Sequence, residues 1–89
     1  MTSKKFLEIC IDLVKHYANM HLDITDESFI VNDDVYVVWS CKTLQNNKAL
    51  LSTTLRDGMY YEVTYNGDKK EFYLDAYKKF ENQVHKYEE

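Results

Sequence analysis

The sequence predicts an α+β domain: an antiparallel meander of four strands, with three as the alternative count, and N- and C-terminal helices packed on one face. Apolar residues recur at helical spacing near both ends of the chain and alternate in the middle. Both glycines, Gly58 and Gly67, fall between alternating segments, and the chain has no proline. With 89 residues, one hydrophobic core and a single α-β-β-β-β-α domain over 1–89 are expected.

The chain begins with a predicted amphipathic helix over residues 3–21. Phe6, Cys10 and Val14 recur on one face, and Ser3 is placed to cap the first turn. A polar, acidic connection follows over 22–34, with a short extended piece expected at 29–31.

Four strands are expected in the middle of the chain, because β-branched and aromatic residues alternate there with polar ones. Gly58 can supply the left-handed conformation of one hairpin loop, and Asn66-Gly67 is typical of a two-residue turn. The expected strands cover 35–43, 48–55, 59–65 and 68–74, with turns at 45–47, 56–58 and 66–67.

All three turns assign the same residues to one buried face, which the two helices would cover. The second helix is expected over 75–86, because aromatic and aliphatic residues from Tyr73 to Tyr87 recur at spacings of four and three. The predicted inward residues are Val37, Trp39, Cys41, Leu51, Leu55, Met59, Tyr61, Val63, Phe72 and Leu74.

The opposite face of the sheet has no remaining segment to cover it. Tyr36, Val38, Tyr60 and Tyr73 fall on this face and form a candidate protein-interaction or homodimer surface. The alternative is that tyrosine is simply a good strand former on a solvated face.

A second candidate surface is the acidic connection. No lysine or arginine occurs between Lys15 and Lys42, and the net charge of the chain is −4. The connection can dock a basic partner or can simply be solvated surface. Its candidate contact residues are Asp26, Glu27, Asp33 and Asp34.

The sequence indicates no catalytic residue, no metal site and no cofactor. His16 and His21 are five apart, whereas residues that neighbour each other on a helix are three or four apart. Cys41 is expected inside the sheet, and no glycine-rich phosphate loop occurs. No apolar run is long enough for a membrane span, and the N-terminus resembles neither a signal peptide nor a transit peptide.

Nucleic-acid binding is disfavoured by the acidic charge. In outline, the predicted order of a helix, strands and a second helix resembles that of the double-stranded RNA-binding domain. Lys78-Lys79 lie near the position of that family's lysine cluster. The glycine-rich approach to the last helix is missing, and Asp75 lies where phosphate would bind.

Three stretches resemble a family of small uncharacterised proteins from tailed phages and prophages of Gram-positive bacteria. They are 34–54 (DVYVVWSCKTLQNNKALLSTT), 57–68 (DGMYYEVTYNGD) and 75–79 (DAYKK). The resemblance implies a phage origin and a place in the bacterial cytoplasm, and it implies no catalytic residue. A non-enzymatic accessory protein that binds a host or phage protein, and that can in this way modulate a host or defence protein, is then the leading hypothesis. A nucleic-acid-associated protein of phage replication or regulation is the alternative.

Overall fold

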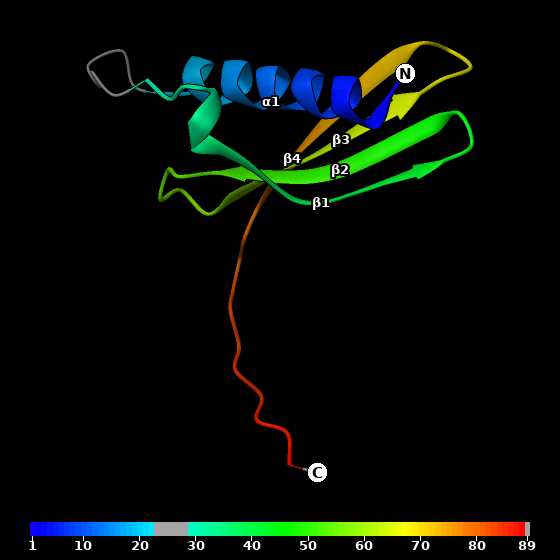
Figure 1. Ribbon diagram of the computed structural model, residues 1–89. Helices are drawn as coiled ribbons and strands as arrows, with labels where there is room; N and C mark the ends of the chain where they lie inside the picture. Colours follow the sequence, from blue (N-terminus) through cyan, green and yellow to red (C-terminus); the bar gives the residue numbers. More distant parts are fainter. Residues whose placement is uncertain (23–28, 89) are drawn as a thin grey trace.

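The computed structural model describes residues 1–22 and 29–88, and it contains one antiparallel sheet with one helix across it (Figure 1). The strands lie in the order β1-β2-β3-β4. The four-stranded meander and the N-terminal helix are therefore confirmed. The elements are α1 (Ser3–Met20), the 3-10 turn η1 (Asn32–Asp34), β1 (Val35–Thr43), β2 (Asn46–Thr53), β3 (Met59–Asn66) and β4 (Glu71–Lys78).

Helix α1 forms because one of its faces is apolar at every fourth residue. Phe6, Cys10, Val14 and Ala18 are all buried against the sheet. The cap is Thr2 rather than the expected Ser3, since the Thr2 hydroxyl accepts a hydrogen bond from the Lys5 N–H at 3.1 Å.

The core lies between α1 and the inner face of the sheet. Leu51, Ala49 and Val63 are fully buried at its centre. Tyr61 meets Tyr17 edge to face with the ring centres 5.5 Å apart. Burial is the main cause of the raised pKa of Tyr61. This small core fixes which side of each strand faces outward.

The β2–β3 and β3–β4 pairs keep the predicted inner face but not the predicted partners. The expected two-residue turn at 66–67 would pair Phe72 with Tyr61, but Phe72 pairs with Tyr65. The register is therefore shifted by an even number of residues, and no side chain changes face. The cause is a longer loop: the Asn66 side chain accepts hydrogen bonds from the N–H groups of Asp68 and Lys69, both at 3.1 Å. The chain reverses over 67–70 instead of in two residues.

Strand β1 contains a bulge that overturns the prediction for Trp39 and Cys41. Val37 pairs with Leu51, but Trp39 pairs with Leu50, so Val38 is an extra residue. Trp39 and Cys41 therefore face outward instead of into the core.

The same bulge turns Ser40 and Lys42 to the helix side. The Lys42 ammonium donates a hydrogen bond to the Met1 carbonyl at 3.2 Å, which fixes that side chain beside the start of α1. Simple alternation along the strand would instead place both residues on the outer face.

The C-terminal helix predicted over 75–86 is wrong. Because the loop is longer, β4 begins later in the sequence than expected. The strand continues to Lys78 and includes the first residues of the expected helix. Residues 79–88 have no regular secondary structure and run away from the sheet on the side opposite α1 (Figure 1). So short a segment cannot hold a helix in water without a surface to pack on.

The two thiols of the chain should differ sharply in reactivity. Cys10 is fully buried, and desolvation raises its pKa to about 12, whereas Cys41 is exposed. We expect a dilute native sample to react with a thiol reagent at one cysteine, and an unfolded sample at two. Cys41→Ser should abolish the native reaction. A native protein with no reactive thiol would place Cys41 inside and disprove the bulge.

Candidate functional site

The outward side of the sheet, called here the open face, has its side chains in rows that cross the four strands. In the first row Tyr36 pairs with Ser52 and Tyr60 pairs with Tyr77. Ser52 and Tyr60 are the next residues beyond the Leu51–Tyr61 pair, so the two halves of this row are adjacent. Three tyrosines thus fall along one line across the sheet.

The next rows are more mixed. Trp39, Leu50, Glu62 and Asp75 form the second row. The third row comprises Cys41, Lys48, Thr64 and Tyr73. The apolar and aromatic groups are therefore concentrated at the end of the sheet from which residues 79–88 depart.

We call Tyr36, Val38, Trp39, Tyr60 and Tyr77 the aromatic rows. Four of them are between 42% and 52% exposed, and Tyr60 is half-buried. Tyrosine and tryptophan combine an apolar ring with a polar tip, and they are enriched at protein interfaces. No other described element covers these side chains, because α1 lies on the opposite side of the sheet (Figure 1).

Beside the aromatic rows, charge is concentrated in one acidic pair. Glu62 and Asp75 are direct neighbours on β3 and β4. The Lys48 ammonium lies 3.2 Å from the Glu62 carboxylate, and no ion pair to Asp75 occurs within residues 1–22 and 29–88. Like charges side by side on a sheet repel each other, so this pair favours a cationic group from a binding partner.

At the edge of the face, Tyr73 is held by its own strand. Its hydroxyl donates a hydrogen bond to the Glu71 carboxylate, and this bond raises the pKa of Tyr73. Tyr73 therefore lies on the predicted face but in the third row, away from the other tyrosines.

The structure brings most of the predicted open-face residues together and adds two. Tyr36 and Tyr60 share the first row, and Val38 is exposed at the bulge. Trp39 and Tyr77 were missed. The alternation from Phe72 to Lys78 is a signal that could have placed Tyr77 on a strand.

The acidic connection is only partly described. Asp33 is exposed, whereas Asp34 is tied into the fold: its carboxylate accepts a hydrogen bond from the Val31 N–H and its carbonyl accepts one from Thr54, both at 2.9 Å. Asp26 and Glu27 lie outside the described residues. Asp34 thus has a structural role at the start of β1.

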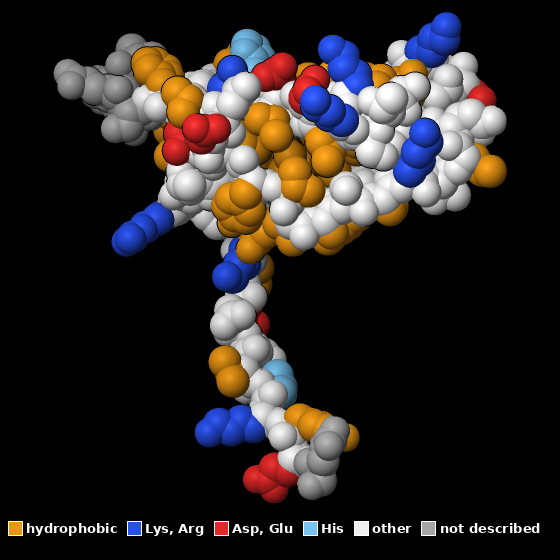
Figure 2. Space-filling view, viewed as in Figure 1, with side chains coloured by type: hydrophobic (Ala, Val, Ile, Leu, Met, Phe, Trp, Pro, Cys, Tyr) orange, Lys and Arg blue, Asp and Glu red, His pale blue; other side chains and the backbone are white. Residues whose placement is uncertain are grey.

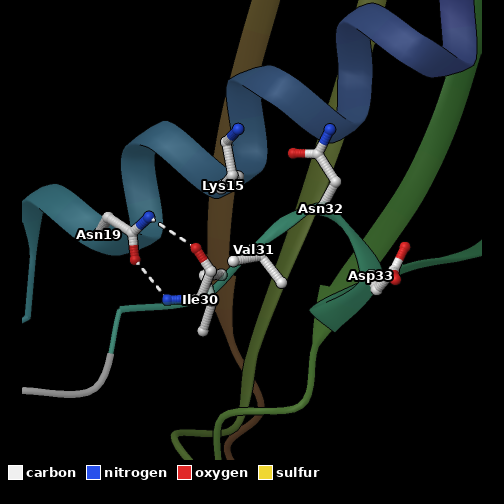
Figure 3. A pocket seen from close by; sticks show the side chains of 6 residues that line it. All are labelled: Lys15, Asn19, Ile30, Val31, Asn32 and Asp33. Carbon is white, nitrogen blue, oxygen red and sulfur yellow. Dashed lines mark hydrogen bonds between the residues drawn. The ribbon is translucent and has the colours of Figure 1, made fainter.

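A shallow hollow lies beside α1, where the connection returns to the helix (Figure 3). Asn19 holds this return: its amide nitrogen donates to the Ile30 carbonyl at 3.0 Å, and its amide oxygen accepts from the Ile30 N–H at 2.9 Å. Ile30 is thereby placed in the core. The lining residues are Lys15, Asn19, Ile30, Val31, Asn32 and Asp33.

The residues that line the hollow beside α1 include no nucleophile paired with a base. Within the described part of the chain, no group of three or more His, Cys, Asp or Glu residues could hold a metal ion. His21 ends α1, where its ring stacks on Tyr17 with the centres 4.1 Å apart. Lys78 and Lys79 lie at the end of β4 rather than at the start of a helix. The order of elements expected of a double-stranded RNA-binding domain is therefore not observed.

Fold and surface together define a small α+β domain whose sheet is covered by a helix on one side and bare on the other. The chain belongs to the family of unknown function DUF6275, whose model matches residues 7–87. The match extends through the C-terminal segment, so that segment is part of what the family shares. Comparison with curated proteins and with solved structures finds no match. None of the described helices is long and apolar enough to cross a membrane.

Proposed function

We propose that this chain is a phage accessory protein of the bacterial cytoplasm that acts without catalysis, by binding another protein through the open face. The aromatic rows are the observation that supports this most directly. They place exposed tyrosine and tryptophan side chains on one flat surface that the rest of the domain leaves bare. Such residues dominate the binding energy of many interfaces.

The composition of the open face also suggests how a partner is selected. Aromatic rings would supply contact area, and the Glu62–Asp75 pair would favour a lysine or arginine at the border of the contact. The phage origin rests on the resemblance of the strands and turns between residues 34 and 79. The partner under this proposal is a host or phage protein.

The proposal is tested by affinity purification of the tagged full chain from phage-infected bacteria, followed by binding measurements with the purified partner. Tyr36→Ser combined with Tyr60→Ser should weaken binding at least about tenfold, because each substitution removes an aromatic side chain from the contact. Cys41→Ser combined with Thr64→Ser is the matched control on the same face outside the aromatic rows.

Equal retention of the partner by the tyrosine variant and the control would contradict the proposed site. Loss of all co-purified protein after nuclease treatment would instead favour the alternative, a nucleic-acid-associated protein.

A further inference from the structure

The segment that we call the tail, residues 79–88, leaves the sheet with all of its apolar side chains bare. Phe80, Val84 and Tyr87 are 98%, 80% and 83% exposed. Figure 2 shows the tail standing clear of the body, with its apolar side chains uncovered. Three large apolar groups on a short polar segment indicate a surface to which that segment binds.

The spacing of these residues indicates the form in which the tail binds. In an extended chain Phe80 and Val84 point to one side and Tyr87 to the other. In an α-helix the steps of four and three residues place all three on one face. The tail contains no glycine or proline. A docked tail is therefore helical.

The tail departs on the side of the sheet that carries the aromatic rows (Figure 1). Its base is fixed, because the Lys79 N–H donates a hydrogen bond to the Gly58 carbonyl at 2.7 Å. To reach its own open face the chain would have to reverse at once. Lys79, Phe80 and Glu81 are not turn-forming residues, and the tail continues outward instead.

We propose that the aromatic rows of one copy of this chain receive the tail of a second copy, in a two-fold dimer that exchanges tails. This inference rests on the proposed function, and it takes the phage protein that the open face binds to be a second copy of this chain. Residues 80–88 as a helix are about 13 Å long, and a row across four strands spans about 14 Å. The tail and the rows therefore match in length.

The buried area also fits a stable dimer. At ~150–250 Å² for each aromatic side chain, one tail carries roughly 400–500 Å² of apolar surface. Two tails on two faces then bury on the order of 1,600–2,000 Å² in total, which is the standard size of a specific interface.

The test measures the mass of the full chain in solution across a range of concentrations, together with fluorescence. Trp39 is the only tryptophan and lies in the aromatic rows at 42% exposure, so its emission reports directly on their burial. We expect the wild type to pass from monomer to dimer with increasing concentration. Over the same range the Trp39 emission should shift to the blue and the helical signal in circular dichroism should rise.

The full-length variant with Phe80→Ser, Val84→Ser and Tyr87→Ser should weaken the dimer at least about a hundredfold, which corresponds to about 2.7 kcal/mol. The matched control carries Glu81→Ser, Gln83→Ser and Lys86→Ser, three changes at polar positions of the same segment. It should still dimerise. A Tyr36→Ser, Tyr60→Ser variant should fail to dimerise alone but should bind the tail variant, since the mixture retains one tail and one intact face.

Three results would overturn the exchange of tails. The first is a wild type that stays monomeric with Trp39 exposed. The second is a dimer that the tail variant forms equally well. The third is a monomer whose Trp39 emission is blue-shifted at every concentration, which would show the tail on its own sheet. A monomer whose open face still binds another protein would leave the proposed function intact. A dimer that binds no further protein would contradict a host partner and would leave the exchange of tails intact.

Discussion

Replacing Leu51 by alanine lowers the free energy of unfolding by about 2–5 kcal/mol, the range expected when a large aliphatic side chain is removed from a packed core. Leu51 has no exposed surface and lies on β2 between Val37 of β1 and Tyr61 of β3, under α1. Because a domain of this size has a small free energy of unfolding, the substitution should remove a large part of that free energy. Chemical denaturation followed by circular dichroism measures the loss.

Leu50→Ala is the matched control, because it removes the same atoms from the neighbouring residue of the same strand. Leu50 is half-buried on the open face in the row of Trp39 and Glu62. Leu50→Ala should lower the free energy of unfolding clearly less than Leu51→Ala does. Equal costs at the two positions, or a larger cost at Leu50, would contradict the assignment of inner and outer faces.

Replacing Gly67 by alanine should destabilise the domain by about 1–3 kcal/mol, the usual cost of forcing extra atoms into a packed site. A Cβ atom at Gly67 would lie 2.2 Å from the Gln45 carbonyl oxygen, and this neighbour is backbone. The Gly67 N–H also donates to the Asn46 side chain at 3.1 Å, so the β1–β2 turn and the β3–β4 loop are joined here. Thermal unfolding measures the effect.

Gly58 is the contrasting position, because an added Cβ atom would make only an ordinary contact with Lys79 at 3.9 Å, but the φ of Gly58 is +70°. Gly58→Ala should cost about 1 kcal/mol through the left-handed backbone alone, and Gly58→Asn should cost less, since asparagine tolerates that conformation. At Gly67 asparagine should be no better than alanine, because any Cβ meets the same carbonyl. If asparagine restored stability at Gly67, steric contact would be the wrong explanation.

Most of the fold could be predicted from the sequence because two periodicities are strong and separate. The four-residue repeat of Phe6, Cys10 and Val14 marks α1, and alternation marks the four strands. The turns were misplaced, but in the β2–β3 and β3–β4 pairs the observed register differs from the predicted one by an even number of residues. Since side chains on a strand alternate, Leu51, Tyr61 and Val63 stayed on the correct side.

Two features could not be derived from periodicity. A bulge shifts alternation by one residue, and nothing in the run from Val35 to Thr43 marks Val38 as the extra one. The spacing from Phe80 to Tyr87 is helical, but a helix of that length needs a surface to pack on, and the apolar side chains of this segment are exposed. Two of the five residues of the aromatic rows were consequently misplaced: Trp39 was assigned to the core and Tyr77 to a helix.

The bulge in β1 makes this edge strand unusually open to change by inherited insertion and deletion. Loss of the single codon for Val38 would leave a regular ladder, with Val37 still opposite Leu51 and Trp39 still opposite Leu50, so that Trp39 and Cys41 would keep facing outward. In β2 or β3 the loss of one residue would invert Leu51 or Tyr61 and destroy the core. A lineage carrying this fold could thus shorten its edge strand by one residue and keep its aromatic surface, whereas β2 and β3 allow no such loss.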